Sequence, residues 1–219
     1  MEFRFQDILK NIIPGLLIIS EIFYIILIQY PCVINDKLLN SLNEIKEISL
    51  VVTLCSAFII GYLIDSLSSW FEHFILYRYL FPKPSFRVLN NNGRYCLYNK
   101  DMIITNIISK FNNVPDLQTN RFDKKHSSLL FKYANILKDD DPETIKNKTS
   151  EFYFSYIFSR NLLFSFFTIF IMSIICDLHF RKFDEIILVH ISIISILLFR
   201  WLDKSAYYTR QVFLASKLS

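Results

Sequence analysis

Four apolar segments, each long enough to cross a lipid bilayer, constrain this chain more than any other feature. They cover Ile12–Tyr30, Ile48–Ile64, Asn161–Cys176 and Ile186–Trp201. A hydrocarbon core of about 30 Å needs roughly 20 predominantly apolar residues, and each segment reaches the usual range once its flanking aromatic residues are included. Because the hydrocarbon offers no partners to backbone polar groups, all four segments should be helices. The alternative is a soluble all-α protein, but its helices would show a polar stripe, whereas Leu162–Ile175 is apolar on every face.

The distribution of positive charge predicts the orientation in the membrane. More than half of the 24 lysine and arginine residues lie between the second and third spans. Because cytoplasmic flanks are enriched in these residues, we expect both termini and the middle segment to be cytoplasmic. Cys32 and Cys176 then fall at the outer ends of their spans, where they form either a disulfide or two separate buried thiols.

Three of the helices should continue well beyond the membrane. The second has no helix breaker before Pro82, and the third begins upstream at Asp140–Glu143, which has the pattern of a helix start with proline at the first helical position. A helix from Pro142 to Cys176 would be roughly 50 Å long. The fourth should begin at Asp184 and continue beyond Trp201 to Phe213.

The polar segment Pro82–Asp141 predicts a small cytoplasmic insert of mixed structure. Its pattern indicates a β-hairpin with a turn at Gly93, followed by two helices. The expected elements are two strands, Phe86–Leu89 and Tyr95–Tyr98, and two helices, Asp101–Phe111 and Asp123–Leu137. The predicted fold is therefore an all-α membrane protein with four transmembrane helices, long cytoplasmic extensions and a small α+β insert, divided into residues 1–81, 82–141 and 142–219.

Two ionisable residues inside the spans are expected to lie at one depth near the middle of the membrane. Glu21 lies about 13 Å and His190 about 15 Å from the inner boundary if the helices rise by 1.5 Å per residue. Ionisable groups in hydrocarbon are costly and usually face a partner or a cavity. This polar layer is either part of an ion or proton path or an interhelical hydrogen bond that holds the helices together.

A second polar layer is expected at the inner boundary of the membrane. Asp65 ends the second span and Glu72 follows on the same helix face; Arg160 and Asn161 open the third span, and Arg200 closes the fourth. These groups form either a structural ring of ion pairs or a gate or ligand site.

No catalytic motif is present, so the sequence predicts neither an enzyme nor a bound metal or cofactor. The remaining enzymatic alternative is an intramembrane or membrane-surface hydrolase that uses Asp65, Glu72 and His73 or His190. Direct nucleic-acid binding is not expected, because the basic run Lys124–His126 is typical of a solvated helix face.

Short motifs at the span ends resemble a known group of proteins. The motifs are Pro14-Gly15, Gly61-Tyr62-Leu63-Ile64-Asp65, Ser159-Arg160-Asn161-Leu162, Tyr207-Tyr208-Thr209-Arg210 and Phe213-Leu214. With them the chain resembles small four-span bacterial membrane proteins found near defence genes, in particular the membrane accessory proteins of type VI-B CRISPR systems. The resemblance implies a location in the bacterial inner membrane and a non-enzymatic role in antiviral defence beside an RNA-guided ribonuclease or its signal.

Taken together, the expectation is a homo-oligomeric pore or channel in the lipid bilayer, regulated through its cytoplasmic region. A passive membrane scaffold that docks a soluble partner through the insert is the second alternative.

Overall fold

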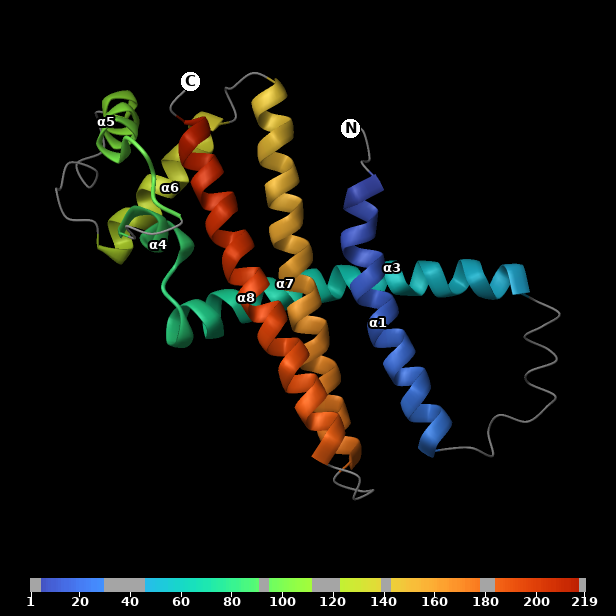
Figure 1. The fold of residues 1–219 in the computed structure, drawn as a ribbon. Coiled ribbons are helices and arrows are strands. Elements are labelled where there is room, and N and C mark those ends of the chain that lie inside the picture. Colours follow the sequence, from blue (N-terminus) through green and yellow to red (C-terminus); the bar gives the residue numbers. More distant parts are fainter. Residues whose placement is uncertain are drawn as a thin grey trace. The chain divides into compact units, whose positions relative to one another are not determined.

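The computed structural model describes residues 5–29, 46–90, 95–111, 123–138, 143–177 and 184–216, and every regular element in these ranges is a helix. Figure 1 shows the helices along the chain. Their bounds are α1 Phe5–Gln29, α3 Lys46–Phe71, the π-helix η2 Glu72–Leu80, α4 Pro84–Asn90, α5 Lys100–Lys110, α6 Lys124–Lys138, α7 Glu143–Asp177 and α8 Asp184–Ala215.

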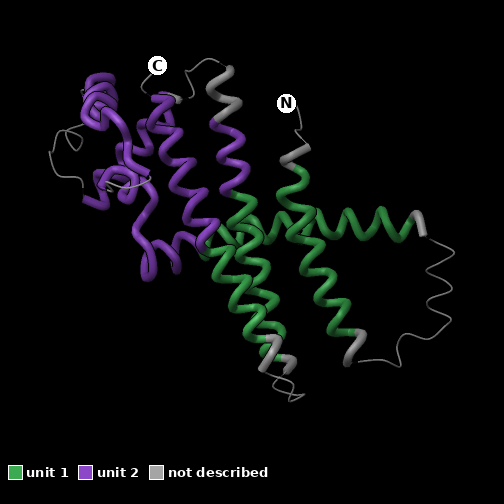
Figure 2. Tube along the Cα trace, viewed as in Figure 1, with its two compact units in different colours: residues 1–71, 157–198 green, residues 72–156, 199–219 purple. Residues whose placement is uncertain are grey.

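The chain divides into two compact units (Figure 2). The first unit comprises residues 1–71 and 157–198, and the second comprises residues 72–156 and 199–219. Both α7 and α8 therefore contribute residues to each unit. The long helices agree closely with the sequence-based prediction, because α7 covers the expected stretch from Pro142 onward and α8 begins at Asp184 and runs past Phe213.

Within the described residues, three helices are long and apolar enough to cross a membrane by length and composition: Ile8–Ile26, Ile48–Leu80 and Thr149–Ile175. The fourth predicted span stays a prediction. The apolar part of α8 is short, because the charged residues Arg200, Asp203 and Lys204 follow it. Large apolar side chains on α3 and α8 are exposed, for example Ile59 at 61% and Ile196 at 66%. So much exposed apolar surface is typical of a protein whose solvent is lipid.

In the first unit, α1 and α3 cross at a contact between their main chains. A Cβ atom added to Gly15 would lie 1.9 Å from the Ala57 carbonyl oxygen, and one added to Gly61 would lie 1.8 Å from the Asn11 carbonyl oxygen. The two contacts pair positions four apart on each helix, which is the small-residue spacing that lets membrane helices approach closely. Figure 1 shows α3 crossing α1 steeply, so the close approach is local.

A small apolar cluster surrounds this crossing. It consists of Ile18, Ile64 and Ile169, one each from α1, α3 and α7, with Leu17, Ile60 and Phe164 packed against them. The three helices therefore meet at one place in the first unit.

The second unit has its own, larger core. Its buried members come from α4, α5, α6 and the end of α8, and they include Val88, Ile103, Ile107, Leu130, Ala134, Val212 and Phe213. The predicted helices Asp101–Phe111 and Asp123–Leu137 are confirmed as α5 and α6. They pack on the final turns of α8.

The predicted hairpin is wrong. Residues Phe86–Leu89 form part of α4, and no strand occurs at Tyr95–Tyr98; the expected turn at Gly93 lies outside the described residues. Pro84 at the first helical position favours a helix start. Ser85, Val88 and Leu89 are all buried, and their spacing of three and four places them on one helical face. Every regular element of the insert that the structure describes is therefore a helix.

Candidate functional site

An ion pair between two apolar helices forms the centre of the first unit. Arg160 on α7 donates from Nη2 to Asp65 Oδ1 on α3 at 2.7 Å. The Arg160 residue is only 8% exposed. Removing a buried charge from water is costly unless it is paired and hydrogen-bonded, so this arrangement needs its further partners.

Two buried polar residues supply those partners. Ser68 on α3 accepts from Arg160 Nε at 3.1 Å and donates to Asn161 Oδ1 at 2.7 Å. The Asn161 amide in turn donates from Nδ2 to Asp65 Oδ1 at 3.0 Å. Ser68 and Asn161 are almost fully buried, at 1% and 0% exposure. The four side chains form a closed polar network, which we call the Asp65–Arg160 network.

The network also reaches the backbone of α1. Pro14 lies inside α1 and has no N–H, so it cannot donate to the carbonyl of Lys10 four residues earlier. Asn161 Nδ2 lies 3.5 Å from that Lys10 carbonyl oxygen and donates to it. Freed backbone carbonyls in membrane helices are commonly satisfied by neighbouring polar side chains. The proline thus provides an acceptor on α1 for a side chain of α7.

Two buried oxygen atoms on the same helices have no hydrogen-bond partner within the described residues. They are Asn11 Oδ1 on α1, next to Lys10, and Ser165 Oγ on α7, one turn after Asn161. Such atoms are rare in folded proteins and are places where water or an ion can bind. The region around the network therefore keeps hydrogen-bonding capacity that the protein itself does not use.

A second polar centre lies in the second unit around Glu72. Its carboxylate accepts from Tyr77 Oη at 2.7 Å and from Trp201 Nε1 at 3.0 Å. Tyr156 Oη lies 2.6 Å from each of the two carboxylate oxygens. Glu72 is 4% and Trp201 0% exposed. We call these four residues the Glu72 cluster. The structure places three aromatic donors around Glu72, and its predicted pairing with arginine stays a prediction.

The π-helix explains how Tyr77 reaches Glu72. In an α-helix, residues five apart point about 140° away from each other. The wider turn of a π-helix, with hydrogen bonds from i+5 to i, brings such residues to the same side. The bond from the Phe81 amide to the Leu76 carbonyl, at 2.7 Å, shows this register at the end of η2. Rare helix types of this kind often occur at functional sites.

The two residues predicted to lie near the middle of the membrane both contact α7. Ser173 Oγ donates to Glu21 Oε1 at 3.4 Å, and the His190 ring lies 6.1 Å from the ring of Phe170. Ser173 and Phe170 are three residues apart and so lie on neighbouring positions of α7. The predicted hydrogen bond between Glu21 and His190 stays a prediction, and both side chains are half-buried.

The residues predicted for the inner boundary belong to both compact units. Asp65, Arg160 and Asn161 form one network in the first unit, whereas Glu72 belongs to the second unit. Arg200 is exposed and belongs to the second unit. Its pairing with Asp65 stays a prediction. Ser68, Lys10, Tyr156 and Trp201 were not predicted as site residues. Ser68 could have been anticipated, because a polar residue adjacent to a charged pair within apolar helices needs a partner.

The described residues contain no group of three or more histidine, cysteine or acidic side chains that could hold a metal ion. His73, one residue of the hydrolase alternative, is exposed and packs its ring 5.3 Å from Phe74. No protein-family model, curated protein or solved structure matches this chain.

Proposed function

We propose that this chain is a multi-pass membrane protein that assembles into a homo-oligomeric pore or channel. The observation that carries the proposal is the Asp65–Arg160 network, a buried ion pair held between apolar helices. Ionisable residues inside membrane segments are costly, and they mark ion paths, relays or gates more often than they serve stability alone. The exposed apolar surface of the first unit is the surface that lipid or further subunits would cover.

Two ionisable layers along one helix support an ion path. Arg160 and Ser173, which contact the inner and middle layers, lie on α7 about 20 Å apart at 1.5 Å per residue. An ion that follows α7 would meet the network first and Glu21 second. The unsatisfied oxygens of Asn11 and Ser165 lie on helices of the same unit and suit a partly hydrated passage.

The resemblance of the span-end motifs extends the proposal to a biological role. In it, the pore belongs to a bacterial antiviral defence system of the CRISPR type, sits in the inner membrane and opens in response to an RNA-guided ribonuclease or its signal. Regulation passes through the second unit, which shares α7 with the network.

The pore is tested with purified protein reconstituted in liposomes that contain an ion-sensitive dye. We expect ion flux from the wild type, and an altered flux from Asp65→Asn and Arg160→Gln, because each removes one charge of the ion pair in the network. Lys110→Gln serves as the matched control, since Lys110 is an exposed cation of α5. Native mass spectrometry in the same detergent gives the number of subunits.

A protein that inserts as a monomer and passes no ions in any lipid composition would overturn the proposal. A scaffold would behave in this way while still retaining a soluble partner through residues 82–141. The hydrolase alternative predicts a different pattern, in which Asp65→Asn abolishes turnover of a lipid or peptide substrate without altering assembly.

A further inference from the structure

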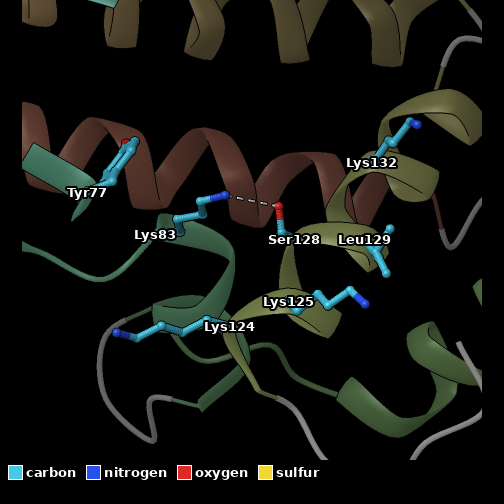
Figure 3. A pocket seen from close by; sticks show the side chains of 7 residues that line it. All are labelled: Tyr77, Lys83, Lys124, Lys125, Ser128, Leu129 and Lys132. Atoms are coloured by element: carbon cyan, nitrogen blue, oxygen red, sulfur yellow. Dashed lines mark hydrogen bonds between the residues drawn. The ribbon is translucent and has the colours of Figure 1, made fainter. Parts of the chain in front are cut away.

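An open pocket in the second unit is lined by lysine side chains. Four lysines, Lys83, Lys124, Lys125 and Lys132, surround a volume of about 490 Å³ together with Ser128 and Tyr77. This volume falls within the usual range of small-ligand sites. Figure 3 shows these residues from close by.

The lysines line the pocket from both sides, and two of them share one face of α6. Lys125 and Lys132 are seven residues apart on α6, two helical turns, so they project from the same side, and Figure 3 shows them there with Leu129 between them. Lys124 extends to the other side of the view. Lys83 approaches α6 from the segment after η2 and donates to Ser128 Oγ at 3.5 Å.

Among the described residues, no acidic group pairs with these charges. No carboxylate lines the pocket, and within the described residues none forms an ion pair with the four lysines. Lys124 and Lys125 also occupy the first turn of α6, where the helix dipole already favours negative charge. Four like charges around a cavity repel each other, and a polyvalent anion would relieve that repulsion.

Tyr77 connects the pocket to the end of an apolar helix and to the Glu72 cluster. Tyr77, part of its wall, lies near the end of the apolar helix Ile48–Leu80, where a membrane helix would leave the hydrocarbon. Tyr77 also belongs to the Glu72 cluster. A second cavity of about 200 Å³, lined by Tyr156, Tyr208 and Thr209, shares Tyr77, Lys83 and Ser128 with the first. A bound anion would therefore lie beside Tyr77, whose hydroxyl donates to Glu72 at the start of the π-helix.

We propose that the lysine pocket of Lys83, Lys124, Lys125 and Lys132 binds the phosphate groups of an anionic ligand. Lysine ammonium groups act as point charges toward phosphate oxygens, and the Ser128 hydroxyl adds a neutral donor once Lys83 moves to the anion. Such phosphates come from either of two sources, the headgroup of an anionic lipid or a soluble phosphorylated compound. The inference is independent of pore activity, because binding is measured without ion flux.

The experiment uses the full-length protein in nanodiscs and compares two variants of equal net charge. Lys125→Gln/Lys132→Gln removes two cations from the pocket, and Lys110→Gln/Arg78→Gln removes two exposed cations that do not line it. In the soluble arm, inorganic tripolyphosphate is titrated into phosphatidylcholine nanodiscs by calorimetry. In the lipid arm, native mass spectrometry counts cardiolipin retained from mixed nanodiscs.

We expect wild type and the control variant to bind in one arm, which identifies the source of the phosphate. One lysine near an anionic surface contributes about 5-fold in affinity, so the pocket variant should bind about 25-fold more weakly in that arm. Lys125→Arg/Lys132→Arg should restore most of the affinity. The proposal is overturned if neither arm shows binding, or if the pocket and control variants lose affinity equally.

Discussion

The side-chain amide of Asn161 donates to the main-chain carbonyl of Lys10 at 3.5 Å, which is the carbonyl that Pro14 leaves without its intrahelical donor. One proline on α1 thereby creates an acceptor for a buried side chain of α7. The same Asn161 nitrogen also donates to Asp65 on α3, so a single amide joins three helices of the first unit.

Replacing Asn161 tests this junction. Asn161→Ala should lower the free energy of unfolding by about 1–3 kcal/mol, because it leaves buried polar groups without partners. In a Pro14→Ala background, residue 14 regains an N–H for the Lys10 carbonyl, so the cost should fall by roughly 0.5–1 kcal/mol. Unfolding in detergent micelles measures both values. Strictly additive effects would show that Asn161 and Pro14 act independently.

Adding one methyl group at the helix crossing should separate α1 from α3. The Cβ of Gly15→Ala or Gly61→Ala would overlap a main-chain carbonyl, and main chain cannot rotate away as a side chain can. We expect a loss of at least about 1–3 kcal/mol, the range for overpacked sites. Ser66→Val adds volume at an exposed position of α3 and should be almost neutral.

Spin labels on α1 and α3 give a second measurement of the same crossing. The distance between labels should lengthen in both glycine variants and stay constant in Ser66→Val. An unchanged distance together with unchanged stability would contradict the main-chain contact.

Breaking the ion pair should be strongly destabilising, and breaking it from both sides should cost less than the sum. Asp65→Asn leaves buried Arg160 without its countercharge, for which we expect about 3 kcal/mol, the lower end of the usual range because the Asp65 side chain is 29% exposed. Arg160→Gln should behave similarly. The double variant should lose less unfolding free energy than the two single variants together, as measured by thermal unfolding. The control Lys110→Gln should stay within about 0.5 kcal/mol of wild type.

The fluorescence of Trp201 reports on the Glu72 cluster. Trp70 is the other tryptophan and is exposed, so a Trp70→Phe background isolates the buried indole. Glu72→Ala removes the acceptor of three donors and should destabilise the second unit by about 1–3 kcal/mol. The Trp201 emission should shift to the red as water reaches the indole. An unshifted spectrum would mean that Trp201 stays buried without its carboxylate partner.

Acidification should loosen the start of α6. Asp123 precedes the helix and accepts from the His126 amide at 2.7 Å, and this bond lowers the pKa of the Asp123 carboxyl below its usual value of 3.8. A lowered pKa means that the stabilisation is complete above about pH 4 and is lost as the pH falls through the folded-state value. Hydrogen exchange of the first amides of α6, compared between pH 5 and pH 3 after correction for intrinsic rates, should show the loss. Asp123→Asn keeps the cap without the charge and should remove the pH dependence.

Helix extent was the easiest property to predict, because it depends on local signals. A proline start near residue 142 and an unbroken apolar run gave α7 to within a residue or two, and the acidic start at Asp184 gave α8. The prediction of a hairpin was wrong for a local reason as well. Phe86–Leu89 is β-prone in composition, but its burial on a helical face against α5, α6 and α8 decided the outcome.

Pairings between distant residues were harder to predict. Equal depth placed Asp65 beside Arg160 correctly, since both lie near the ends of apolar runs. The aromatic partners of Glu72 were missed, because the sequence does not show that η2 leaves the α-helical register after Phe71. Tyr156 and Trp201, which hold Glu72, are 84 and 129 residues away from it. The spacing of Asn11 to Gly15 and of Ala57 to Gly61 was a usable signal for the helix crossing that the sequence interpretation missed.

The crossing of α1 and α3 has a consequence for how the two helices find each other. In hydrocarbon, the burial of apolar groups provides no drive toward association, so even a small entropic cost matters. Contacts made by Gly15 and Gly61 immobilise no rotatable side chain, and so the helices sacrifice almost no conformational freedom when they touch. These two positions should consequently admit only glycine, while the lipid-facing positions beside them can exchange one apolar residue for another over many generations.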